Sequence, residues 1–182
     1  PIISLAMNNL LLVLKDLKKS FDGKFYITKA VRSELIDKPL NSKKYEFEAL
    51  QVLQYIKKGV IEQIVDDNIS DKTLKILDAA NNCFIGQNNP IRIVHYPEIE
   101  TLAAAIHLGT NIIVVDERTT RMLIESPKKL AYILENKLHT DIEVNNGALK
   151  EFSKLVKGVK VLRSVELVTI AYENGLWNSY IT

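Results

Sequence analysis

The sequence contains very little of what several classes of protein require. The single cysteine, Cys83, excludes an intrachain disulfide and a cysteine-based zinc site, and it fits a reducing, cytoplasmic location. Strictly apolar runs reach only five residues, as at 10–14, which is far too short to cross a bilayer. The opening of the chain has neither a basic region nor a small-residue cleavage site, so we expect no signal peptide and no membrane partner.

An excess of one charge is also lacking. The 24 Lys and Arg residues face 22 Asp and Glu residues, and the net charge of +2 argues against a basic arm that holds nucleic acid by charge alone. The seven glycines form no glycine-rich loop for a nucleotide phosphate. The three histidines, at 95, 107 and 139, have no metal-ligand spacing, and we expect each of them to be structural.

The sequence does contain an alternation of helical and strand patterns. The patterns predict helices at 1–19, 30–37, 43–58, 70–84, 97–108, 118–124, 128–138, 145–157 and 164–173, and strands at 24–28, 60–65, 112–115 and 160–162, with 91–94 either a strand or an extended entry to a helix. Pro39 and Gly86 are expected to end helices. The four β-branched residues 112–115 are typical of a strand that is buried on both faces of a parallel sheet.

This alternation predicts an α/β fold with a mainly parallel sheet. We expect a single domain over residues 1–182. A helical insertion is possible at about 126–158, because this segment separates two strand signals by more than one helix. Trp177 and Tyr180 offer packing surface for the domain itself or for a partner subunit.

Acidic residues follow the strand at 112–115 and also open the helix before it. Asp116 and Glu117 come directly after the strand, at the sheet edge where α/β proteins form their sites. A helix that leads into a parallel strand runs antiparallel to it, so Glu98 and Glu100 are expected near Asp116. Clustered carboxylates repel one another unless a cation lies between them, and ligand sets made only of oxygen favour Mg²⁺ or Mn²⁺. The alternative is that these acids only cap helices and interact with helix dipoles.

A further acid, Glu34, follows the strand at 24–28 and lies in the short helix expected at 30–37. Because Val31 and Leu35 would face inward, Glu34 can reach the edge of the same crevice. The alternative is a surface acid paired with Arg32 or Lys38, an interaction of little energetic weight.

Three segments of the sequence together resemble the PIN domain. PIN domains are Mg²⁺- or Mn²⁺-dependent ribonucleases with a three-layer α/β/α sandwich around a central, mainly parallel sheet. The segments that carry the resemblance are Val-Arg-Ser-Glu-Leu at 31–35, Glu-Ile-Glu-Thr-Leu-Ala-Ala-Ala at 98–105 and Asp-Glu-Arg-Thr-Thr-Arg at 116–121. The resemblance covers most of residues 1–121, and 160–175 are similar to the closing strand and helix of the family.

The resemblance implies an endoribonuclease that hydrolyses RNA phosphodiesters with a metal-activated water. It assigns metal binding and catalysis to Glu34, Glu100 and Asp116, with Glu98 and Glu117 as possible further ligands. It assigns contact with RNA to Arg118, Thr119, Arg121, Lys128 and Lys129. The alternative for these basic residues is a solvated helix face. A homodimer, or a complex with an antitoxin-like or other protein partner, is an expectation from the family alone.

One element of the family pattern has no counterpart in the sequence. Residues 1–5 are similar to the stretch that follows the family's first strand and the Asp that ends it. We expect this strand either upstream of Pro1 or lost. If it is lost, the alternative is a catalytically inactive PIN-like module that binds RNA or protein. A flavodoxin-like or receiver-like domain is a third alternative, but it would place its acids at the exit of the first strand.

Overall fold

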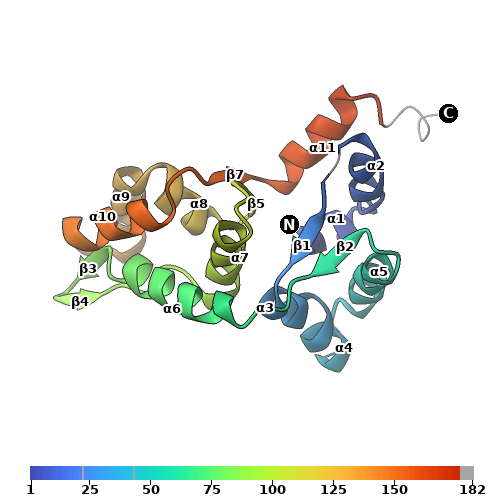
Figure 1. Ribbon diagram of the computed structural model, residues 1–182. Helices are drawn as coiled ribbons and strands as arrows, with labels where there is room; N and C mark the ends of the chain where they lie inside the picture. Colours follow the sequence, from blue (N-terminus) through green and yellow to red (C-terminus); the bar gives the residue numbers. More distant parts are fainter. Residues whose placement is uncertain (22, 43, 177–182) are drawn as a thin grey trace. The chain divides into compact units, whose positions relative to one another are not determined.

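The computed structural model describes residues 1–21, 23–42 and 44–176, and the chain folds into two compact units (Figure 1). Unit 1 consists of Pro1–Val65 together with the segment that begins at Leu162, and unit 2 consists of Asp66–Val161. The insertion expected at 126–158 lies within unit 2. Trp177 and Tyr180 lie outside the described residues.

Unit 1 is built around two short parallel strands. Strand β1 (Phe25–Ile27) pairs with β2 (Ile61–Gln63), with Phe25 opposite Ile61. Its helices are α1 (Ile2–Met7), α2 (Leu12–Ser20), α3 (Lys29–Arg32), α4 (Lys38–Ser42), α5 (Glu46–Lys57) and α11 (Ser164–Glu173), with a π-helical segment at Ser33–Asp37 between α3 and α4. Leu14, Ile36 and Val52 are buried in its core.

The helix boundaries of unit 1 differ from the sequence predictions at two places. The single helix expected over 1–19 is two helices, because Asn9 adopts a left-handed φ of 55° between them. Pro39 does not end a helix: it is the second residue of α4, which continues directly from the π-helical segment Ser33–Asp37.

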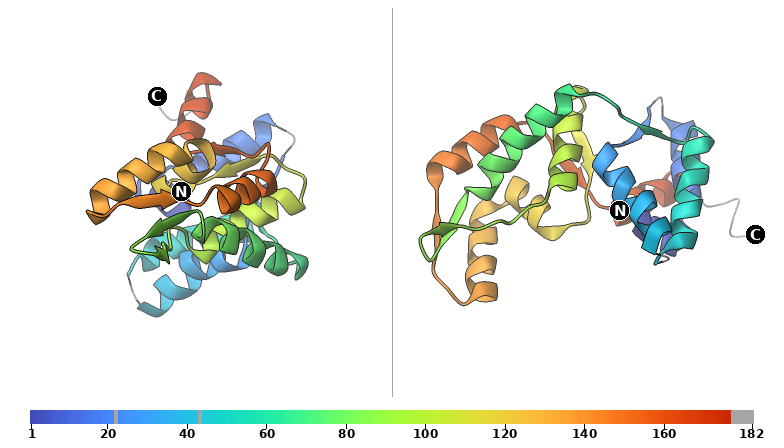
Figure 2. Two further views of the ribbon diagram at one scale, coloured as in Figure 1. Left: turned by 90° about the vertical axis from the view of Figure 1, so that its left-hand side faces the viewer. Right: turned by 90° about the horizontal axis from the view of Figure 1, so that it is seen from below.

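Unit 2 combines two small sheets with five helices among the described residues. Strand β3 (Phe84–Gly86) pairs antiparallel with β4 (Asn89–Pro90) and with β6 (Ile142–Val144), and β5 (Ile112–Val114) pairs with β7 (Lys160–Leu162). The helices are α6 (Asn68–Asn81), α7 (Tyr96–His107), α8 (Arg118–Glu125), α9 (Pro127–Leu138) and α10 (Asn146–Leu155). Helix α6 packs against both α7 and α10, and Figure 2 shows α10 alongside α6.

The α/β class is confirmed, while several details of unit 2 are not. Strand β6 has no counterpart in the prediction, and Phe84 belongs to β3 instead of α6. Leu74 is exposed, and α6 buries Thr73 and Ile76 in its place. Ile112 is 50% exposed, so β5 is not buried on both faces as its β-branched run predicts. In the described part of the chain, no helix has the length and apolar character that crossing a membrane requires.

Cys83 is expected to be chemically inert in the folded protein. It is fully buried between α6 and β3, its Sγ lies 3.2 Å from the Ala79 carbonyl oxygen, and burial raises its pKa to about 11. Because the thiolate is the reactive form, labelling by a thiol reagent at pH 8 should be slow in native buffer and complete in guanidinium. Fast stoichiometric labelling of the native protein would contradict this burial.

Candidate functional site

The acids of α7 and of the segment after β5 lie at one end of unit 2. Helix α7 packs against β5, and only residues 108–111 connect the two elements, with Gly109 in a left-handed conformation at φ 68°. The two elements therefore run in opposite directions. The 12 residues of α7 rise about 18 Å and the five residues from the connection to Asp116 extend about 16 Å, so Asp116 returns to the N-terminal end of α7. Glu98 and Glu100 occupy this end of the helix.

Glu100 is a buried acid in a helix that is otherwise apolar on its buried faces. It is 8% exposed, and its neighbours Ile99, Leu102 and Ala103 are fully buried. An ionised carboxylate in such surroundings is costly unless hydrogen-bond donors or a cation stabilise it. Glu100 has a stabilising interaction within the protein, so its burial is compatible with a structural role as well as with a ligand role, and Glu98 is half-buried with its Oε2 atom removed from solvent.

Asp116 and Glu117 occupy the junction between β5 and α8. Asp116 is half-buried and follows the buried Val115. The Glu117 carboxylate caps α8, because its oxygens accept hydrogen bonds from the backbone N–H groups of Thr119 at 2.7 Å and Thr120 at 2.6 Å. Partial desolvation opposes the ionisation of Glu117, but these hydrogen bonds outweigh it and hold its pKa below the usual value of 4.5. Helix capping, which the sequence offers as the alternative role for these acids, is thus present at Glu117.

Thr120 places a hydroxyl group in the interior at the start of α8. Its Oγ1 atom is buried and makes no hydrogen bond of standard geometry to the described residues, although the Thr119 and Thr120 side chains contribute to the lowered pKa of Glu117. Buried polar atoms without a well-formed hydrogen bond are rare and often mark functional positions.

Removal of the Glu117 carboxylate is expected to destabilise unit 2 in a pH-dependent way. Loss of an N-cap costs about 1 kcal/mol. Glu117→Ala should therefore lower the free energy of unfolding at pH 7 by about this amount, which appears as a lower midpoint of urea denaturation. Because the folded-state pKa is depressed, this stabilisation is present above the unfolded pKa and is lost as the pH falls through the folded value. The difference in unfolding free energy between the variant and the original chain should shrink towards pH 3, and a difference that grows in acid would contradict the capping role. The measurement is made in metal-free buffer, so that loss of metal binding does not contribute to the difference.

The basic side chains expected to contact RNA also lie on α8 and α9, which pack against each other. Arg118, Lys128 and Lys129 are exposed, and no carboxylate oxygen of the described residues lies within 4.0 Å of their charged groups. Arg121 is half-buried, with its Nε atom 3.9 Å from a carboxylate oxygen of Glu125. Thr119 is half-buried, and its backbone N–H donates a hydrogen bond to the Glu117 carboxylate.

Glu34 belongs to unit 1, whereas the other candidate ligands belong to unit 2. Its side chain is 48% exposed, and one carboxylate oxygen lies 3.6 Å from the Lys38 Nζ atom. This is the surface pairing that the sequence offers as an alternative. Glu34 also lies in the π-helical segment Ser33–Asp37, a local geometry that is frequent at functional sites.

The candidate ligands supply only carboxylate oxygens, which suit Mg²⁺ or Mn²⁺. Among residues 1–21, 23–42 and 44–176, no three His, Cys, Asp or Glu side chains form a group that could hold a metal ion. The connection between α7 and β5 directs Glu98, Glu100, Asp116 and Glu117 toward one end of these elements, without gathering three of them into such a group.

One polar pair of unit 2 had no signal in the sequence. The His107 Nε2 atom lies 2.8 Å from Oδ2 of Asp66, which links the C-terminus of α7 to the start of α6. A hydrogen bond from the Asn68 backbone N–H, together with the Asn68 and His107 side chains, outweighs desolvation and lowers the pKa of Asp66. The two residues are 41 positions apart, and no local pattern could have paired them.

Comparison of the chain with models of protein families, with curated proteins and with solved structures finds no match.

Proposed function

We propose that this chain is a metal-dependent endoribonuclease of the PIN type, which hydrolyses RNA phosphodiesters with Mg²⁺ or Mn²⁺. The observation that carries the proposal is the burial of the acidic residue Glu100 in α7, the helix whose short connection to β5 directs Asp116 toward the same end. Two acids that a helix and a strand bring to one edge, one of them buried, form a site that suits a divalent cation. The proposal includes the three-layer α/β/α sandwich with a central, mainly parallel sheet.

Glu100 and Asp116 of unit 2 would hold the cation. The resemblance adds Glu98 as a possible further ligand, although it lies about 200° around α7 from Glu100, given 3.6 residues per turn. When bound, the divalent ion activates a water for in-line attack on the phosphodiester and offsets charge on the leaving oxygen. The lowered pKa of Glu117 keeps it ionised at neutral pH, and the α8 N–H groups fix its carboxylate in one orientation.

The basic side chains beside these acids serve the substrate. Arg118, Lys128 and Lys129 present cationic groups without carboxylate partners among the described residues, and can attract the phosphates of an RNA strand to a centre that is itself acidic. Arg121 and Thr119, on the same helix as Arg118, complete the proposed RNA contacts.

The test is RNA cleavage by the purified chain in Mn²⁺ or Mg²⁺, compared with the same reaction in EDTA. We expect cleavage products only with the metal, and none from a DNA of the same sequence. Calorimetric titration with Mn²⁺ in the absence of RNA gives an independent reading of the metal site. RNA binding without cleavage or metal binding would instead favour the catalytically inactive PIN-like module.

A further inference from the structure

Helix α10 and the turn after it carry three lysines that the proposed catalytic site does not use. We call Lys150, Lys154 and Lys157 the lysine row. All three are exposed. In a helix with 3.6 residues per turn, Lys150 and Lys154 differ by only about 40° around the axis and by about 6 Å along it. Lys157 follows in the turn after α10, so the three positive charges come from one continuous strip of the surface.

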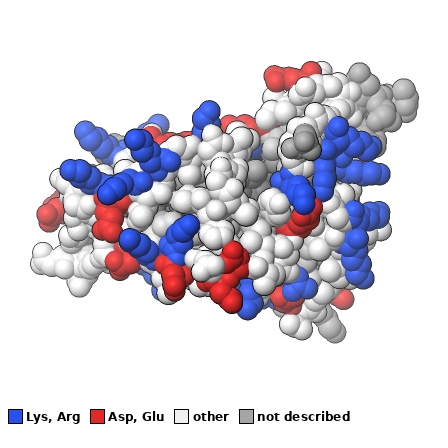
Figure 3. Space-filling model, in the orientation of Figure 1, with Lys and Arg blue, Asp and Glu red and all other residues white. Residues whose placement is uncertain are grey.

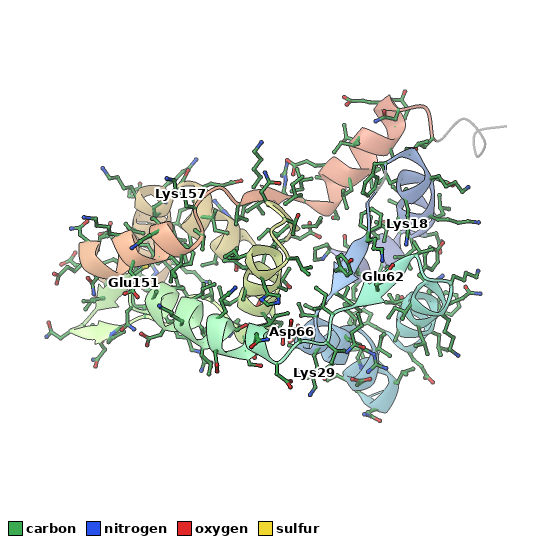
Figure 4. All side chains as sticks on the ribbon, viewed as in Figure 1. Lys18, Lys29, Glu62, Asp66, Glu151 and Lys157 are labelled. Atoms are coloured by element: carbon green, nitrogen blue, oxygen red, sulfur yellow. The ribbon has the colours of Figure 1, made fainter. Side chains whose placement is uncertain are left out.

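The charges of the lysine row are not neutralised within the protein. No carboxylate oxygen of the described residues lies within 4.0 Å of any of the three ammonium groups. Lysines of unit 1 differ, because Lys18 and Lys24 share the carboxylate of Glu62 at 3.6 Å and 3.1 Å. Figure 4 shows Lys18 beside Glu62.

The one acidic residue of α10 makes no ion pair with the row. Glu151 is about 100° around the helix from Lys150 and about 60° from Lys154, given 3.6 residues per turn, but no oxygen of its carboxylate lies within 4.0 Å of either ammonium group. In Figure 4 it lies apart from Lys157, and Figure 3 shows Lys and Arg side chains gathered over α9 and α10.

The opposite face of α10 is not available for insertion into a membrane. That face carries the buried side chains of Phe152 and Val156 and packs against α6. A helix that lies in a membrane surface needs a free apolar face to insert between the lipids, and α10 has already committed its apolar face to the core of unit 2. The surface of α10 that remains accessible to a partner carries mainly the positive charge of the lysine row.

We infer that the lysine row is a docking surface for the phosphate backbone of a nucleic acid strand, which, if the proposed function holds, is the RNA substrate. The row is about 10 Å long by the rise of a helix, and its three ammonium groups can contact successive phosphates of one strand. Lysine ammonium groups act as point charges, so the surface positions the strand without reading its sequence.

The experiment measures binding of a fluorescein-labelled single-stranded RNA by anisotropy in EDTA, where no metal-dependent cleavage occurs. The test variant is Lys150→Gln with Lys154→Gln and Lys157→Gln. Its dissociation constant at about 0.1 M salt should rise about tenfold or more, and the slope of log K against log salt should flatten by about 2, since three contacts to a single strand are lost. Because all three side chains are exposed, its thermal melting should match that of the original chain.

The matched control is Lys19→Gln with Lys44→Gln and Lys75→Gln, which removes the same net charge from exposed positions on other elements. We expect its binding to change by less than about threefold at the same salt concentration. An equal loss in both variants would show a net-charge effect and overturn the inference, as would no loss in the row variant or no RNA binding by the original chain. Sedimentation with phosphatidylserine vesicles forms a second arm, and loss of vesicle binding with unchanged RNA binding would also overturn it.

Failure of this inference is distinguishable from failure of the proposed function. A row variant that binds RNA poorly, in a protein that never cleaves RNA, would support the docking surface and reject the nuclease. RNA cleavage by the original chain, together with unchanged RNA binding by the row variant, would support the nuclease and reject the docking surface.

Discussion

The Asp116→Asn variant is expected to lose at least about a hundredfold of the Mn²⁺-dependent rate of RNA cleavage, since even residues behind metal ligands are worth about 10–100-fold. Asparagine keeps the size and one oxygen of the side chain but removes the negative charge that would hold the cation. Asp116 is half-buried and follows β5, so the substitution should leave folding nearly unchanged. Initial rates with RNA below saturation, combined with calorimetric titration by Mn²⁺, measure the effect.

Asp141→Asn is the matched control for this prediction. Asp141 is an exposed residue of unit 2 that precedes β6, and its loss should change neither the rate nor Mn²⁺ binding. Glu100→Gln and Glu34→Gln should each reduce cleavage as Asp116→Asn does, if they are ligands. Full activity of Asp116→Asn with an intact circular dichroism spectrum would remove Asp116 from the catalytic machinery.

Replacing Phe152 by alanine is expected to cost unit 2 about 3–5 kcal/mol of stability, the usual range for a buried phenylalanine. Phe152 is 1% exposed and anchors α10 where this helix packs against α6. Removal of the ring leaves a cavity that the surrounding helices can only partly fill. Urea denaturation followed by circular dichroism measures the loss, and amide hydrogen exchange assigns it to α6 and α10.

The chain offers a control of the same residue type. Phe47 on α5 is 67% exposed, so Phe47→Ala removes the same side chain with little loss of buried surface. The free energy of unfolding of this variant should change by less than about 1 kcal/mol. Equal effects of the two substitutions would mean that α10 is not anchored through Phe152. The lysine row depends on this anchor, because Phe152 holds the helix that presents it.

Local sequence signals placed most elements of the fold. Proline near the start and glycine after the end bounded α7 almost to the residue, and the β-branched run located β5. Local signals were wrong where long-range packing decided the outcome. Phe84 continues the apolar spacing of α6 but pairs in β3 with Val144, a residue 60 positions away. The division of the first helix at Asn9 did have a local signal, because asparagine adopts the left-handed conformation and ends helices more often than most residues do.

The sequence by itself determined the chemistry available to this protein: acids before and after one strand, lysines at helical spacing, and a single cysteine. Connectivity alone directs Glu100 and Asp116 toward one end, since a helix that packs against a strand and is joined to it by a short turn runs against it. The capping role of Glu117 is likewise local, because its partners lie two and three residues away. Tertiary structure decided which of these groups are removed from solvent. Burial of Glu100 and exposure of the lysine row depend on neighbours distant in sequence, because desolvation and ion pairing are properties of packed surfaces and not of local spacing.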